Sequence, residues 1–263
     1  MSHGLNRAER LAALRAQVKK IEGLGSVGGA GFMPLGVDEV DGRIAGGGLA
    51  AHALHEVAAA SAHVADDAAA TLFLAALAGR KLRSGDAGAG NGARSGDVLW
   101  ALARRDLFAP GLAQAGLAPD RLLYAECRND DEVLAVMEEG LRHGGLAAIV
   151  GEVGRCAMAA GRRLQLAAEE GGTMALMLRR WKRAGRDPLA EPSPAVTRWR
   201  VGCAPSAPIP VAGVGRARWH VDLVRQRGGE PANWILEAPD AEARLALFSP
   251  PSDRADQAVR RAA

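Results

Sequence analysis

The sequence predicts an α/β domain with a largely parallel central sheet, flanked by helices, and with antiparallel strands at its C-terminal end. Between residues 53 and 178, short apolar segments typical of buried strands alternate with segments of helical periodicity. From residue 196 onward, strand patterns follow one another with turns and without helices between them. A parallel core with right-handed crossovers, extended by a β-meander, accounts for both observations.

Local patterns justify the elements in order. Gly46–Gly48 allow a backbone turn that residues with a Cβ would resist, and they precede the first strand. Strands are expected at 53–58, 98–102, 121–125, 146–150, 173–178, 196–201, 217–225 and 233–237. Helices are expected at 67–83, 110–118, 129–143 and 162–170. Asn129 or Asp130 should cap the third helix, and the glycine-rich residues 84–97 should form a loop.

The two ends of the chain differ in composition from this core, which we place at residues 25–240. Residues 5–22 predict a helix, and glycines from Gly23 onward predict a linker, so 1–24 form a separate unit. The apolar stripe of this helix consists of Leu11, Leu14, Val18 and Ile21. Such a helix can dock on its own core, on another subunit or on a partner. Residues 241–263 predict a tail, disordered from about 249 onward.

Composition limits the class of protein. The chain has 263 residues, 33 Lys and Arg, 30 Asp and Glu, and 48% hydrophobic residues, which excludes full disorder and allows a sizeable core. No apolar run reaches the length of about 18–20 residues that spans a bilayer. The N-terminus lacks the apolar core of a secretion signal, so a cytoplasmic location is expected. The cysteines Cys127, Cys156 and Cys203 form no CxxC pair, and buried free thiols are expected.

A nucleotide-hydrolysing phosphate loop requires glycines, a lysine and a Ser or Thr between a strand and a helix. The equivalent place follows the strand at 53–58, where residues 58–71 contain no glycine and no lysine. Asp66 and Asp67 are expected at the start of the next helix, where carboxylates complement the helix dipole and repel phosphate. The sequence therefore predicts no cofactor and no ATP hydrolysis of the usual kind.

Some carboxylates and histidines near strand ends are of the types that bind metal ions. Glu152 follows the strand at 146–150, where it could hold a metal ion or be a polar residue at a strand end, and the missing phosphate loop favours the second reading. The same holds for Glu126. His55 and Glu56 point to opposite faces of a strand, so a metal site with His52 is disfavoured. We predict no metal ligand and no catalytic residue.

Positive charge is concentrated in residues 155–227, with 14 Lys and Arg against 5 Asp and Glu. Residues 179–186 are expected to form an exposed basic loop. On the adjacent strands, side chains two apart share a face, so Arg198 and Arg200 should point opposite to Trp199. Such arginines could contact DNA or an acidic partner; the alternative is a solvated face with Trp199 and Trp219 in the core. The candidate contact residues are Arg179, Arg180, Arg198, Arg200, Arg216 and Arg218.

The order of these features resembles the core of RecA-type recombinases. The chain is more closely similar to the ImuA family of bacterial SOS-response proteins, which are RecA-like with a degenerate phosphate loop. The residues that carry this resemblance are 14–23, 34–36, 46–49, 54–57, 98–100, 104–107, 132–134, 137–140, 163–169, 197–201 and 218–219. The resemblance spans roughly residues 10–240, and it rests on the ordered set of motifs because no single one is specific.

This resemblance implies a non-catalytic adaptor in SOS-induced error-prone translesion DNA synthesis. The implied partners are RecA, an inactive Y-family polymerase homologue of the mutasome and an error-prone replicative-type polymerase. By analogy with RecA filaments, the stripe from Leu11 to Ile21 would contact a neighbouring RecA-like subunit. Two alternatives are a RecA-like ATPase with an atypical nucleotide site and an SOS cell-division inhibitor.

Overall fold

A computed structural model describes residues 31–89, 96–182, 186–206, 213, 215–240, 242 and 244–248. The stripe formed by Leu11, Leu14, Val18 and Ile21 and the tail from 249 onward lie outside the described residues. No helix in the described part of the chain combines the length and the apolar character needed to cross a bilayer.

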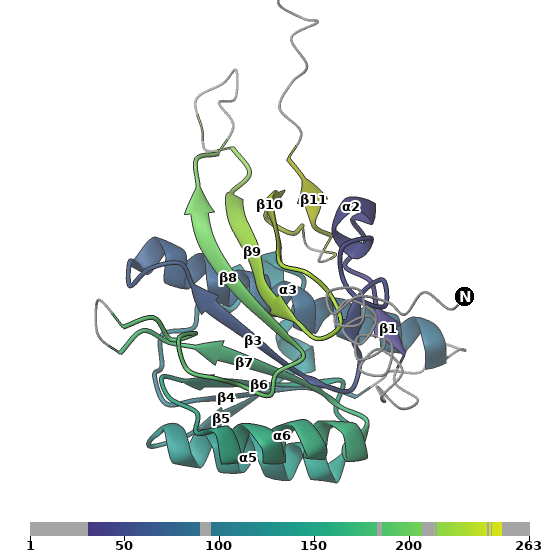
Figure 1. Cartoon of the computed structure of the whole chain (residues 1–263), viewed down its shortest axis with the longest axis vertical. Helices are drawn as coiled ribbons and strands as arrows, with labels where there is room; N and C mark the ends of the chain where they lie inside the picture. Colours follow the sequence, from purple (N-terminus) through teal and green to yellow (C-terminus); the bar gives the residue numbers. More distant parts are fainter. Residues whose placement is uncertain are drawn as a thin grey trace, which may run out of the picture.

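A nine-stranded mixed sheet forms the centre of the described chain, in the order β11-β10-β9-β8-β3-β7-β6-β4-β5 (Figure 1). Its strands are β3 (Leu54–Ala59), β4 (Val98–Leu102), β5 (Leu122–Glu126), β6 (Ala148–Val153), β7 (Met174–Arg179), β8 (Thr197–Ala204), β9 (Arg218–Gln226), β10 (Ala232–Glu237) and β11 (Ala246–Leu247). Strands β3 to β8 pair in parallel, and β8 to β11 pair antiparallel. The predicted fold class, a largely parallel sheet with antiparallel C-terminal strands, is confirmed.

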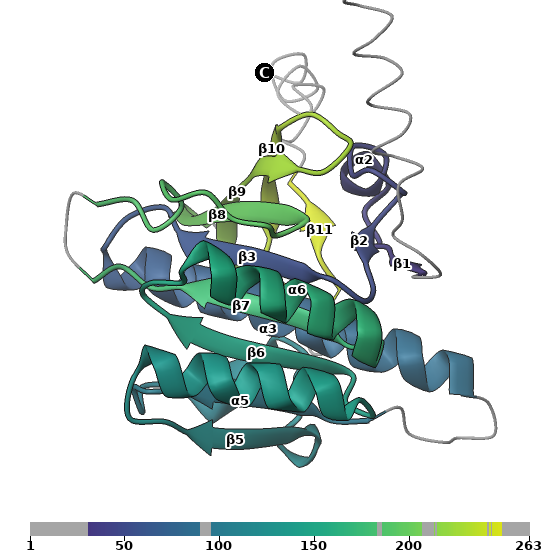
Figure 2. The same ribbon diagram turned by 60° about the horizontal axis from the view of Figure 1, so that its bottom comes forward.

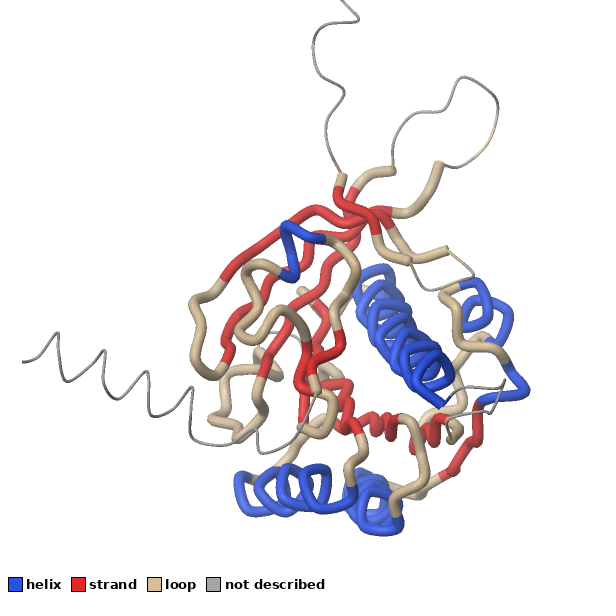
Figure 3. Tube along the Cα trace, turned by 90° about the vertical axis from the view of Figure 1, so that its right-hand side faces the viewer, coloured by secondary structure: helices blue, strands red, loops and turns tan. Residues whose placement is uncertain are grey.

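Helices cover both faces of this sheet. The helix α3 (Val64–Ala89) lies on one face, and α5 (Asp130–His143) and α6 (Met158–Gly171) lie on the other (Figures 2 and 3). Each face has its own apolar core: one packs against α3 and the other against α5 and α6. The shorter elements are β1 (Phe32–Met33), α2 (Asp38–Asp41), β2 (Leu49–Ala50), α4 (Ala109–Gln114) and the 3-10 turn η1 (Pro119–Arg121).

Local chemistry explains several element boundaries. The Asn129 side chain accepts a hydrogen bond of 3.0 Å from the Glu132 amide, which caps α5 as the sequence predicts. Gly46 and Gly47 have φ of +88° and +75°, so the turn before β2 uses a backbone conformation that favours glycine.

The helix α3 is longer than predicted, and the expectation of a loop from residue 84 is wrong for residues 84–89. Asp86, in the last turns of α3, lies 2.8 Å from the guanidinium of Arg121, which also contacts Asp97 at 3.1 Å. This tertiary ion pair holds a glycine-containing segment against the sheet, and its local propensity alone would not maintain a helix there.

The aromatic core lies between α3 and the strands β8 and β9. Trp199 and Trp219 are buried beside Phe73, with ring centroids 5.8 Å and 6.2 Å from it. The sequence allowed either arginines that contact DNA or tryptophans packed in the core, and both tryptophans are packed in the core as the second alternative predicts.

Candidate functional site

The carboxyl ends of the parallel strands meet at one edge of the sheet, which is where open α/β sheets place their ligand sites. At this edge, the loop after β3 leads into α3, whose first turn carries Asp66 and Asp67 as expected. Asp66 accepts hydrogen bonds from the Ser61 hydroxyl and from the Cys203 amide. The side chain of Asp66 is thus held at the N-terminal end of the helix by two groups of the protein itself.

A buried ion-pair cluster fills the space beside this helix start. The guanidinium of Arg180, the residue after β7, forms a close ion pair with Asp67 and lies 2.8 Å from Oε2 of Glu152. Trp100 Nε1 donates a hydrogen bond of 2.7 Å to the other oxygen of Glu152. Arg180 therefore connects the start of α3 with the end of β6.

Burial determines the electrostatics of this cluster. It raises the pKa of the Glu152 carboxyl above its ordinary value, and Arg180 and Trp100 offset only part of that effect. Burial by itself would lower the pKa of Arg180. The neighbouring carboxylates of Glu152 and Asp67 have the larger opposite effect, so the pKa of the guanidinium is raised. The internal cation Arg180 thus sits among the carboxylates Glu152, Asp67 and, at 3.7 Å, Asp106.

These residues do not fit a nucleoside triphosphate, the cofactor of RecA-type proteins. A triphosphate at the start of α3 would meet Asp66 and Asp67, and no lysine lies in the loop before them. Glu152 is 4% exposed and engaged by Arg180, so it is not presented to a metal ion at a strand end. The sequence predicted a strand that ends at residue 150, with Glu152 after it. In the structure β6 runs to Val153, so Glu152 lies inside the strand.

A second buried cluster lies on the opposite face of the sheet. Glu56 in β3 receives Arg179 at 3.1 Å from β7, Arg198 at 2.7 Å from β8 and the Ser193 hydroxyl at 2.8 Å. The side chains of Glu56, Arg179 and Arg198 are all less than one-tenth exposed. One carboxylate thus joins three neighbouring strands, although the sequence separates Glu56 from the arginines by more than 120 residues.

The expectation that residues 179–186 and the basic strand face are exposed is wrong for three of the six candidate arginines. Arg179, Arg180 and Arg198 are buried at 2%, 8% and 6% exposure, because carboxylates on neighbouring strands neutralise them. Arg200 is half-buried and forms a close ion pair with Asp187. These three side chains therefore present little of their charge at the open surface of the sheet.

Of the last two candidates, Arg216 has a side chain that is 39% exposed, whereas that of Arg218 is 12% exposed. Arg216 donates hydrogen bonds to the carbonyl oxygens of Ala238 at 2.7 Å and Arg244 at 3.2 Å. Arg218 stacks over the Phe248 ring, with its guanidinium carbon 3.6 Å from the centroid. Both arginines therefore also pack the C-terminal strands together.

The remaining candidates have structural surroundings. His55 is fully buried, with Nδ1 2.8 Å from Thr197 Oγ1 and Nε2 2.9 Å from the Ala50 carbonyl oxygen, and burial lowers its pKa to about 4. Among the described residues, no group of three or more His, Cys, Asp or Glu side chains could hold a metal ion. Glu126 pairs at the surface with Arg105. All three cysteines are free, but Cys203 is exposed, contrary to the expectation of buried thiols.

Sequence reasoning located both acidic residues of α3 but missed the partners of Arg179 and Arg180. One signal was available, because adjacent residues at a strand end point to opposite faces. Two consecutive arginines at the end of an apolar strand, such as Arg179 and Arg180, can therefore each pair with a carboxylate on a different face of the sheet. The identity of the carboxylates depends on the strand order, which no local pattern reveals.

The fold and the site together define an α/β protein with a largely parallel sheet in which internal ion pairs occupy the edge where a phosphate loop would act. Two curated relatives, both named Protein ImuA and from two strains of Caulobacter vibrioides, NA1000 / CB15N and CB 15, are 39% identical to the chain over 214 residues. The alignment covers 80% of this chain and 84% of each relative. The chain belongs to the ImuA family.

Comparison with family models and with solved structures gives no further information on the function of this chain. No family model matches the chain. The crystal structure of SulA from Pseudomonas aeruginosa aligns with 49% of this chain and 98% of its own, at 21% identity and a TM-score of 0.39. A likeness of that size bears on neither the fold nor the function of this protein.

Proposed function

We propose that the protein is a non-catalytic adaptor in SOS-induced, error-prone translesion DNA synthesis. Membership of the ImuA family, with 39% identity over 80% of the chain, is the observation that carries this proposal. Its partners would be RecA, the inactive Y-family polymerase homologue of the mutasome and the error-prone replicative-type polymerase. The expected phenotype of a deletion is a loss of damage-induced mutations.

The cluster around Arg180 supports the non-catalytic part of the proposal. Two carboxylates at the start of α3 oppose a triphosphate, and Arg180 satisfies Asp67 and Glu152 without any ligand. An ATPase with an atypical site would need Glu152 to engage a metal ion or a water molecule. That engagement requires the ion pairs of Arg180 to open first.

Nucleotide binding is the direct test of this part. We expect titration of the full chain with Mg-ATP to show no saturable binding at micromolar concentrations and no phosphate release. Micromolar binding that Glu152→Ala abolishes would overturn the adaptor proposal in favour of an ATPase. The variant Glu126→Ala, which removes a surface carboxylate at the end of β5, is the matched control.

Partner binding tests the adaptor role. The stripe formed by Leu11, Leu14, Val18 and Ile21 is the proposed contact with RecA. We expect Leu14→Asp with Val18→Asp to weaken binding to immobilised RecA without changing the unfolding curve of the chain. The control is Val64→Asp, because Val64 is an aliphatic side chain that is 85% exposed on the described surface. Equal binding by both variants and the wild type would contradict the proposed contact.

Arg200 and Arg216, which keep the largest exposed fractions among the six candidate arginines, are the proposed contact with DNA or an acidic partner. We expect Arg200→Glu with Arg216→Glu to weaken single-stranded DNA binding at low salt and to reduce its salt dependence. Arg163→Glu on α6 is the control, since it changes the net charge at an exposed site. If the first variant and the control bind DNA equally, these arginines do not form the contact.

A further inference from the structure

A basic cavity of about 310 Å³ opens at the ends of β6 and β7, next to the cluster at the start of α3, whose Arg180 also lines it. Five cationic side chains and the two carboxylates of Asp187 and Glu191 line it. Three of the cations have carboxylate partners outside the cavity: Arg180 pairs with Glu152, Lys182 lies 2.8 Å from Asp130, and Arg179 lies 3.1 Å from Glu56, which Arg198 also engages. Among the described residues, Arg155 and Arg186 have ion pairs only with Glu191, and Arg179 shares Glu56 with Arg198, so these three arginines supply the charge available to the cavity.

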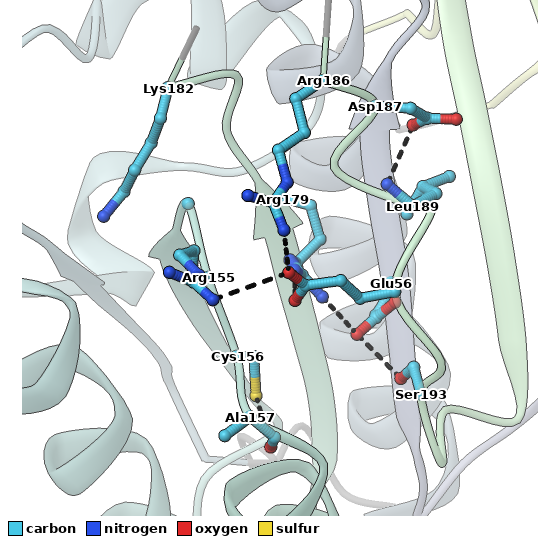
Figure 4. Close-up of polar contacts among 12 residues, drawn as sticks. Glu56, Arg155, Cys156, Ala157, Arg179, Lys182, Arg186, Asp187, Leu189 and Ser193 are labelled. Atoms are coloured by element: carbon cyan, nitrogen blue, oxygen red, sulfur yellow. Dashed lines mark hydrogen bonds and ion pairs between the residues drawn. The ribbon is translucent and has the colours of Figure 1, made fainter.

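These three arginines converge from separate segments of the chain (Figure 4). They share one carboxylate, that of Glu191, at distances of 3.8 Å from Arg155, 3.9 Å from Arg179 and 3.1 Å from Arg186. Only the contact with Arg186 lies within hydrogen-bond range. One carboxylate cannot satisfy three guanidinium groups, so donors remain for another oxyanion.

Arg179 forms the buried part of this arrangement. Its side chain is 2% exposed, and it donates one hydrogen bond of 3.1 Å to Glu56. Within the described residues, its Nε is buried and has no hydrogen-bond partner. A buried guanidinium with an unused donor is unfavourable unless a ligand or water supplies an acceptor.

Glu191 lies much closer to solvent than Arg179, whose side chain is enclosed. Glu191 is 31% exposed, and Arg155 and Arg186 are 70% and 71% exposed at the mouth of the cavity. Asp187, the other carboxylate, is already engaged, because it accepts from the Leu189 amide at 2.8 Å and pairs closely with Arg200. Glu191 is therefore the carboxylate that competes with an incoming anion.

We propose that this cavity binds a phosphate group, with Arg155, Arg179 and Arg186 as its donors and Glu191 as an internal carboxylate that the ligand displaces. A phosphate group offers more acceptor atoms than a carboxylate and matches the fork of a guanidinium. The cavity volume is at the lower end of small-molecule sites, which suits one phosphate with a small substituent. This site is independent of the proposed adaptor role, and its proposed donors do not include Arg180, the cation of the cluster at Asp67 that also lines the cavity.

Two sources can supply such a group: a free phosphate or phosphomonoester, and a phosphodiester of single-stranded DNA. The full chain and its variants are titrated with inorganic phosphate by calorimetry, and separately with a fluorescent oligothymidine. We expect Glu191→Gln to tighten binding by about tenfold, because the competing charge is removed while the side-chain size is kept. Arg186→Gln should weaken binding by about tenfold through the loss of a charge-assisted hydrogen bond.

Matched controls separate this effect from net charge. Glu138→Gln and Arg163→Gln change the same charges in an ion pair of 2.9 Å between α5 and α6, away from the cavity. If the variants alter phosphate binding, the ligand is a free phosphate; if they alter only oligothymidine binding, it is a phosphodiester, and both results support the site. If Glu191→Gln and Arg186→Gln bind both probes like their controls, the proposal is overturned.

The variants at this site are expected to fold. Arg186 is 71% exposed, so its replacement leaves no buried charge, and a urea unfolding curve checks each protein before titration. Binding to partner proteins and damage-induced mutagenesis are measured in separate assays. A negative result for the phosphate site therefore does not contradict the adaptor proposal, and a negative result for the adaptor proposal does not contradict the phosphate site.

Discussion

We expect replacement of Arg180 by methionine to lower the free energy of unfolding, because the buried carboxylates around Arg180 lose their cation. The change keeps an apolar stem of similar length and removes the guanidinium that pairs with Asp67 and Glu152. Glu152 then remains with a side chain that is 3% exposed and with Trp100 Nε1 as its donor. Removal of one partner from a buried ion pair costs about 3–5 kcal/mol of unfolding free energy.

The loss should depend on pH. Burial already raises the pKa of Glu152, and removal of Arg180 takes away the charge that counteracts this rise. A carboxyl whose folded pKa lies above its unfolded value favours the folded state at low pH and loses that contribution as pH rises through the folded pKa. The variant should therefore be most destabilised at neutral pH and recover towards the wild type on acidification.

Urea unfolding followed by tryptophan fluorescence measures both effects. The double variant Arg180→Met with Glu152→Gln should recover much of the stability, because the buried charge is gone and the glutamine oxygen can still accept from Trp100. Arg163→Gln serves as the surface control. A loss below about 1 kcal/mol at pH 7, or no recovery in the double variant, would refute the reasoning.

Two further predictions concern single side chains. The folded pKa of His55 is about 4 against an ordinary 6.5, so the wild type should lose about 3 kcal/mol as pH falls from 6.5 to 4, a slope that His55→Gln should lack in pH-dependent urea unfolding. An unchanged slope would show that another group titrates. Asn129→Ala should cost about 1 kcal/mol because α5 loses its cap, whereas Asn129→Asp should keep it; equal losses in thermal unfolding would contradict the capping role.

The amino-acid sequence by itself determined the features that depend on local periodicity. It predicted the strand and helix alternation, the antiparallel end, the cap of α5 and the acidic first turn of α3. The buried positions of Trp199 and Trp219 agree with one of the two alternatives that the sequence left open. These features need no knowledge of the strand order, because neighbouring residues alone set the pattern of burial.

Tertiary structure decided which charges meet. The order of the strands places β3 between β7 and β8, so Glu56 lies beside Arg179 and Arg198, and β6 beside β7 brings Glu152 to Arg180. Arginines that the local pattern predicts to face solvent are buried as a result. The physical reason is that the free energy of a buried charge depends on its nearest counter-charge, and here that counter-charge comes from a distant part of the chain.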